Sequence, residues 1–224
     1  PPYVRWGSMG ERHNGVAGRN GLIVLGPFGR GNVDYRWIGE RDVLRCLAEA
    51  KRRFAVDDDR VYLGGESMGG HGTWLIASRH PQRFAAAAPV FGGWDYRVWP
   101  ADQFNHPRGT RPSELFAREV QSSFASAEGL LHVPLYVVHG DIDPAVPVEH
   151  SRHAVRMLQR WGYDLRYHEV PRRGHEDLNL RDAIAAWLLR HRRVRAPRDV
   201  RLRAIDLAGA SAHWVEVTGW LDPL

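Results

Sequence analysis

The chain has 224 residues, which is enough for one ordinary domain with a full hydrophobic core and part of a second. Its net charge is +5, but the arginines are scattered and no basic run is interleaved with aromatic residues, so we expect no nucleic-acid partner. No apolar run approaches the roughly 20 residues that span a bilayer, so we expect no membrane insertion. Cys46 is the only cysteine, which excludes an intramolecular disulfide and a multi-cysteine zinc site.

Apolar runs and amphipathic segments alternate along most of the chain, beginning with a run at residues 21–27 that is bounded by glycines. The predicted strands are residues 21–27, 60–63, 84–91, 133–139 and 165–170, and the predicted helices are residues 40–54, 69–79, 113–126, 146–161 and 180–191. This alternation predicts a mostly parallel sheet with helices on both faces. Residues 94–112 form a long loop rich in aromatic residues and proline, of the kind that serves as a lid or binding segment.

The pattern changes near the C-terminus. Residues 194–199 are a predicted linker, after which residues 200–204 and 214–218 alternate between apolar and polar side chains. Such alternation is typical of half-exposed antiparallel strands. We therefore expect residues 200–224 to form a hairpin that opens a β-rich extension. The chain starts at Pro1-Pro2 without an initiator methionine or signal peptide, and we expect both ends to be cut from something longer.

Gly65-Glu66-Ser67-Met68-Gly69 follows a predicted strand and precedes a predicted helix. The pattern G-x-S-x-G in that context marks a nucleophile elbow, a strained turn that exposes a serine hydroxyl. We expect both flanking glycines to be needed because their neighbours approach closely. The N–H groups at the start of the following helix would point to the same place.

A serine hydroxyl needs a base to take its proton and an acid to orient that base, here in the chain order serine, acid, histidine. The loop after the strand at residues 133–139 offers Asp141 and Asp143, and the residues alone leave both open. His175 is the best candidate base among 12 histidines, because it follows a glycine in the loop after the last strand. Any single histidine is more often structural or exposed to solvent than catalytic.

An oxyanion hole needs two N–H donors, and the first is expected at Met68, directly after the serine. The second should come from a loop after an earlier strand, but residues 1–20 contain no His-Gly-Gly run that would supply it. His71, Trp94 and Tyr96 are candidate substrate-binding residues. Ordinary loop packing is an equally good explanation for the aromatic pair.

Three stretches carry a resemblance to a known family. Ile38 to Trp74, including Gly65-Glu66-Ser67-Met68-Gly69-Gly70-His71-Gly72, looks like the prolyl oligopeptidase family of α/β-hydrolases, in the branch close to dienelactone hydrolases and bacterial esterases. His139-Gly140-Asp141-Ile142-Asp143 resembles the family's acid loop, in which the aspartate four residues after the histidine is catalytic. Gly174-His175 resembles the histidine loop. The family's oxyanion segment and first strands are not seen.

The resemblance implies an α/β-hydrolase catalytic domain over residues 1–195, incomplete at its N-terminus, followed by the β-rich extension at residues 196–224. It implies an acyl-enzyme mechanism in which Ser67 attacks, His175 moves the proton and Asp143 supports His175, with no metal or organic cofactor. The first expected function is cleavage of a small-molecule ester, and the second is peptide cleavage, since the family includes both. A non-catalytic binding domain is the third; it would predict a broken triad.

Overall fold

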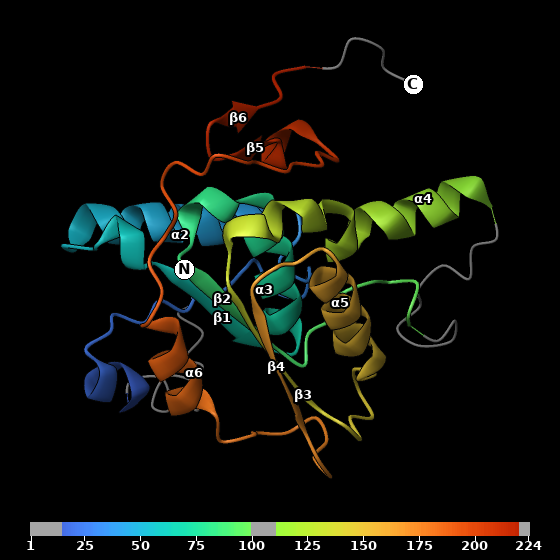
Figure 1. The fold of residues 1–224 in the computed structure, drawn as a ribbon, viewed down its shortest axis with the longest axis horizontal. Coiled ribbons are helices and arrows are strands. Elements are labelled where there is room, and N and C mark those ends of the chain that lie inside the picture. Colours follow the sequence, from blue (N-terminus) through green and yellow to red (C-terminus); the bar gives the residue numbers. More distant parts are fainter. Residues whose placement is uncertain (1–14, 100–110, 220–224) are drawn as a thin grey trace.

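A computed structural model of the chain describes residues 15–99 and 111–219 (Figure 1). Its centre is a four-stranded sheet whose strands lie side by side in chain order and are all parallel. The strands are β1 (Tyr62–Glu66), β2 (Ala86–Val90), β3 (Leu135–Gly140) and β4 (Leu165–Val170). The register sets Leu63 beside Ala87 and Val90 beside Val138. The predicted parallel sheet is therefore confirmed.

Helices cover both faces of this sheet (Figure 1). They are α2 (Ile38–Arg53), α3 (Met68–Arg79), α4 (Pro112–Gln121), α5 (Glu149–Arg160) and α6 (Arg181–Leu188). Successive side chains of a strand point to opposite faces, and β3 divides accordingly. Leu135 and Val137 pack in one cluster with residues of α3 and α5. Tyr136 and Val138 pack in a second cluster with Trp187 of α6.

The run at residues 21–27 does not form the predicted strand, which is a correction to the sequence analysis. It is irregular, and Ile23, Val24 and Leu25 are exposed. A strand exists only when a neighbour takes up its backbone hydrogen bonds. Within the described residues, β1 lies at the edge of the sheet and pairs with β2 alone, so this run has no strand beside it.

The predicted helix at residues 113–126 is divided in two, which is a second correction. α4 ends at Gln121, and the 3-10 helix η3 (Ser123–His132) follows. Ser122 between them is extended, with φ −81° and ψ 138°. Its hydroxyl accepts a hydrogen bond from the Tyr96 N–H (2.8 Å) and donates to the Arg118 carbonyl (2.7 Å). A serine that bonds the backbone in this way favours a helix end over continued helix.

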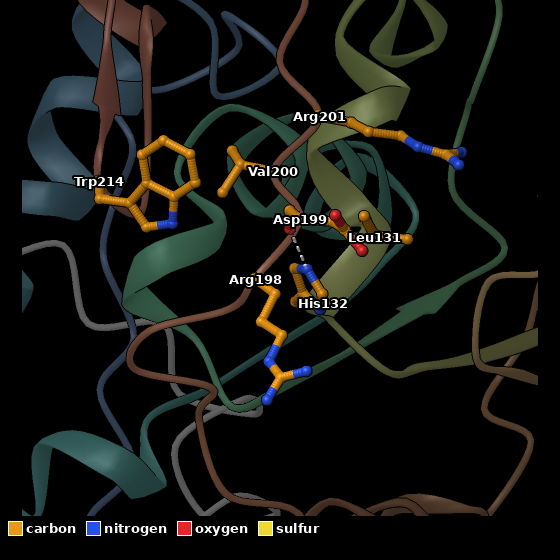
Figure 2. A pocket seen from close by; sticks show the side chains of 7 residues that line it. All are labelled: Leu131, His132, Arg198, Asp199, Val200, Arg201 and Trp214. Carbon is orange, nitrogen blue, oxygen red and sulfur yellow. Dashed lines mark hydrogen bonds between the residues drawn. The ribbon is translucent and has the colours of Figure 1, made fainter.

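The C-terminal segment forms a small antiparallel sheet of β5 (Ser211–Ala212) and β6 (Val215–Glu216). Residues 200–204 are irregular, so the first predicted strand of the hairpin is wrong. These residues cross over η3, where the His132 ring donates to the Asp199 carbonyl (2.6 Å). A groove of about 650 Å³ lies there, with the exposed Trp214 at one side (Figure 2).

None of the helices in the described ranges has the length and apolar character needed to cross a bilayer.

Candidate active site

Ser67 lies between the end of β1 and the start of α3, in the strand–turn–helix setting that the motif predicts. Its backbone has φ 56° and ψ −118°, a conformation that a residue with a side chain rarely adopts. Strain of this kind costs about 1–3 kcal/mol and persists only where surrounding contacts hold it. One such contact is the hydrogen bond from the Ser67 N–H to the Val90 carbonyl at the end of β2 (3.0 Å).

The two glycines of the motif are not equivalent. A Cβ on Gly65 would come within 2.4 Å of the Gly69 carbonyl oxygen, so no larger residue fits there without moving backbone. A Cβ on Gly69 would have nothing within 4 Å. The close approach that the sequence analysis expected on both sides is therefore required only at Gly65.

Ser67, His175 and Asp143 form one hydrogen-bonded chain. Nε2 of His175 lies 2.8 Å from the Ser67 hydroxyl oxygen, and Nδ1 lies 2.8 Å from Oδ2 of Asp143. A carboxylate only accepts, so Nδ1 donates to Asp143 and Nε2 is left to accept the serine proton. These three side chains come from the turn after β1, the loop after β3 and the loop after β4.

Asp143 is held on both carboxylate oxygens. Oδ1 accepts from the backbone N–H groups of Ala145 and Val146, each at 2.8 Å. Burial by itself would raise the pKa of Asp143, but hydrogen bonds from His139, His175 and these two amides outweigh it. The pKa of Asp143 therefore lies well below its usual range, and the carboxylate stays ionised at neutral pH.

His139, whose place in the motif served only to locate the acid, is fully buried and supports Asp143. Its Nε2 donates to the Val146 carbonyl (2.9 Å) and lies 3.5 Å from Oδ2 of Asp143, while Nδ1 accepts from the Ser151 hydroxyl (2.7 Å). Phe91, directly after β2, packs on the His175 ring with centroids 4.6 Å apart. Its place as the last residue of the predicted strand at residues 84–91 was the only signal for it in the sequence.

The structure separates the two candidate acids. Asp143 faces His175, whereas Oδ1 of Asp141 accepts from the backbone N–H of Arg172 in the histidine loop (2.6 Å). The Ile142 N–H also donates to the Arg173 carbonyl (3.1 Å). Asp141 therefore helps to join the acid loop to the histidine loop, and Arg172 there has a positive φ of 58°.

The remaining candidates lie at the start of α3 and in the segment after β2. Met68 is the first residue of α3, where backbone N–H groups lack intrahelical partners. His71 donates from Nδ1 to the Gly93 carbonyl (2.9 Å), and its ring meets the Tyr96 ring edge-on. Tyr96 is buried and donates to Asp34 (3.0 Å). Trp94 has no exposed surface and packs on Trp74 in the core, so packing accounts for its position.

A parallel sheet covered on both faces, with a serine on a tight turn between strand and helix, defines an α/β-hydrolase fold. The sequence model of the prolyl oligopeptidase family matches residues 33–192, which include Ser67, Asp143 and His175. The chain therefore belongs to the prolyl oligopeptidase family.

Curated relatives match about half of the chain or less. An uncharacterized secreted protein of Arthroderma benhamiae is 34% identical over 122 residues, covering 54% of this chain and 13% of that protein. A bifunctional acetylxylan esterase/xylanase of Neocallimastix patriciarum is 27% identical over 132 residues, or 53% of this chain and 19% of that protein. The chain thus spans less than a quarter of the length of these relatives.

Solved structures agree on the fold. A thermostable esterase is 25% identical, with a TM-score of 0.51 over 69% of this chain and 37% of the esterase. An acylaminoacyl peptidase of Pyrococcus horikoshii has a TM-score of 0.55 at 18% identity, over 67% of this chain and 26% of the peptidase. At that identity, the likeness to the peptidase shows the fold alone.

Proposed function

We propose that this chain is the catalytic part of a serine hydrolase that cleaves carboxylic esters through an acyl-enzyme. The observation that carries the proposal is the continuous Ser67–His175–Asp143 hydrogen-bonded chain, with Nε2 of His175 2.8 Å from the serine oxygen. A base within 2.6–3.2 Å of the nucleophile and oriented by a third group is what nucleophilic catalysis by serine requires.

In this mechanism the Ser67 oxygen bonds to the carbonyl carbon of the ester while Nε2 of His175 takes the hydroxyl proton. His175 then gives that proton to the oxygen of the leaving alcohol as the carbon–oxygen bond breaks, which leaves an acyl-serine. Water attacks the acyl-serine with His175 again as base, which releases the acid and restores the Ser67 hydroxyl. Asp143 stays ionised and stabilises the imidazolium form of His175.

The Met68 N–H is the proposed first donor to the oxyanion, since it lies next to Ser67 at the start of α3. The positive end of that helix adds favourable interaction with the developing negative charge. Ester cleavage is favoured over peptide cleavage because an acetylxylan esterase (27% identical) and a thermostable esterase (25%) are more similar to this chain in sequence than the acylaminoacyl peptidase (18%).

The test is labelling with a fluorophosphonate probe, followed by hydrolysis of matched p-nitrophenyl esters and peptidyl p-nitroanilides. We expect the wild-type chain to label and to prefer esters, and Ser67→Ala and His175→Ala to lose labelling. Ser113→Ala, on the exposed start of α4, is the matched control and should label normally. Faster cleavage of the anilides would favour a peptidase. A wild-type chain that neither labels nor hydrolyses would contradict the proposal.

A further inference from the structure

One guanidinium group joins the segments that hold Ser67 and His175. Nη2 of Arg181 lies 2.7 Å from Oε1 of Glu66, the residue directly before Ser67. Nη1 of Arg181 donates over 2.6 Å to Oδ2 of Asp177, two residues after His175. The Arg181 side chain is 19% exposed, so these pairs are partly shielded from water. A planar guanidinium can serve two carboxylates with separate nitrogens, which a lysine ammonium does not match.

The position of Arg181 within its own helix does not explain why a positively charged residue stands there. Arg181 is the first residue of α6, where the positive end of the helix dipole disfavours a cation. The next residue, Asp182, has the charge that this position favours. The stabilising contacts of Arg181 are therefore those with Glu66 and Asp177, both outside its own helix.

Both segments that Arg181 joins contain strained backbone. Ser67 has φ 56°, and Asn179, between Asp177 and Arg181, has φ 54°. Conformations of this kind persist only where surrounding contacts hold them. A second arginine supports the same loop, because Nη2 of Arg173 donates to the Asp177 carbonyl (2.8 Å).

We propose that Arg181 is a positioning residue that holds the histidine loop against the nucleophile elbow through Asp177 and Glu66. The proposal deepens the proposed function and rests on it. By holding the two segments together, Arg181 would maintain the 2.8 Å contact between Nε2 of His175 and the Ser67 oxygen. A misplacement of about 1 Å between reacting groups can lower a rate by about 100-fold.

Arg181 also changes the balance of charge around the histidine loop. It partly compensates the negative charges of Glu66 and Asp177. The other charged residues at or beside this loop include Asp141, Asp143, Arg172, Arg173 and Glu176. Removing the Arg181 cation leaves the Glu66 and Asp177 carboxylates facing each other uncompensated, and their repulsion acts to separate the loop from the elbow.

The test compares Arg181→Met and Arg181→Lys with the wild-type chain and with Arg190→Met. Arg190 is exposed two residues after the end of α6, so its replacement controls for the loss of one positive charge. The surroundings of the His175 ring are followed by NMR through its imidazole signals at a single pH, which are assigned by their loss in His175→Gln. The values of kcat and KM are measured with a p-nitrophenyl ester over a range of pH.

We expect Arg181→Met to lower kcat by about 10- to 100-fold with little change in KM, because the reacting groups are misplaced while substrate binding is kept. Arg181→Lys should recover part of kcat, and Arg190→Met should match the wild type. A folded Arg181→Met chain with wild-type kcat overturns the proposal.

If Arg181→Met fails to fold, Glu66→Gln weakens the link at the elbow by removing its negative charge while leaving the Arg181–Asp177 pair intact. It should lower kcat, and an unchanged kcat would overturn the proposal.

If the wild-type chain shows no hydrolysis, the proposed function fails. The positioning role is then decided by the NMR signals of the His175 imidazole, which should differ between wild type and Arg181→Met; identical signals would overturn it.

Discussion

Nε of Arg79 donates a hydrogen bond to Oε1 of Glu40 over 2.7 Å, and both side chains are almost wholly buried. Nη2 of the same guanidinium donates to Asp206 (2.8 Å), so it joins α2, α3 and the C-terminal segment. Glu40 also accepts from Nε2 of His80 (2.7 Å). The pKa of Glu40 is lowered because these hydrogen bonds and the charge of Arg79 outweigh the effect of its burial.

Replacing Arg79 by methionine should therefore destabilise the fold. Glu40 would remain buried with only part of its compensation, and removing one partner of a buried pair costs about 3–5 kcal/mol. The free energy of unfolding, measured by urea titration, should fall by that amount. Arg83→Met is the matched control, because Arg83 is exposed and lies at the end of the short 3-10 helix Pro81–Arg83 that follows α3. Equal stability of the two variants would show that the buried network contributes little.

The two aspartates of the acid loop should differ in their effect on activity. Asparagine at position 143 would present an N–H to Nδ1 of His175 and so favour the tautomer that cannot accept the serine proton. The same aspartate-to-asparagine change in a serine protease triad lowers kcat by about 10⁴-fold. Asparagine at position 141 keeps an oxygen for the Arg172 N–H and should cost little. Rates of fluorophosphonate labelling check both. Similar losses in the two variants would contradict the proposed role of Asp143.

His150 should make stability depend on pH. Burial, with a smaller effect of His139, lowers the pKa of His150 to about 3, and its Nδ1 accepts from the N–H groups of Trp94 and Asp95. In the unfolded chain a histidine has a pKa of about 6.5, so between these values the unfolded chain binds more protons. The stability that the neutral ring contributes is present above pH 6.5 and is lost as the pH falls toward 3.

Urea unfolding at two pH values measures this effect. Between pH 7 and pH 5, His150 should account for a loss of about 2 kcal/mol in the free energy of unfolding. His150→Asn keeps an acceptor for the Trp94 N–H but does not titrate, so its loss over the same interval should be smaller by that amount. The same pH dependence in both proteins would mean that His150 is protonated in the folded state.

The two motif glycines give a direct test of the elbow geometry. Gly65→Ala places a methyl group against the Gly69 carbonyl, and such overpacking costs about 1–3 kcal/mol. Gly69→Ala meets open space within α3, where alanine is favoured over glycine by up to about 1 kcal/mol. Thermal and urea unfolding should therefore rank Gly69→Ala at or above wild type and Gly65→Ala below it. The reverse order would exclude the described turn.

Much of the architecture could be predicted from local patterns of apolar and polar residues in the sequence. Short apolar runs that alternate with amphipathic segments predicted four strands of the sheet and the helices that cover it. The glycine-flanked Ser67 between such a strand and helix predicted the elbow, which has the expected strained backbone. The errors were also local. Residues 21–27 have the composition of a strand but no neighbouring strand in the described chain, and Ser122 ends a helix that its flanking sequence would continue. Residues 200–204 alternate like a strand but are irregular.

The sequence by itself determined which segments are strands and helices, which serine lies on a turn, and which loops contain a candidate acid and base. Those properties follow from side-chain periodicity and turn chemistry within a few residues. The residues alone left Asp141 and Asp143 open and the family resemblance favoured Asp143; the tertiary structure has Asp143 facing His175. Only the tertiary structure decided that Trp94 is a core residue and that Arg181 joins Glu66 to Asp177. Ser67 and His175 are 108 positions apart, and contacts over that distance depend on how the sheet and helices pack, which no local pattern records.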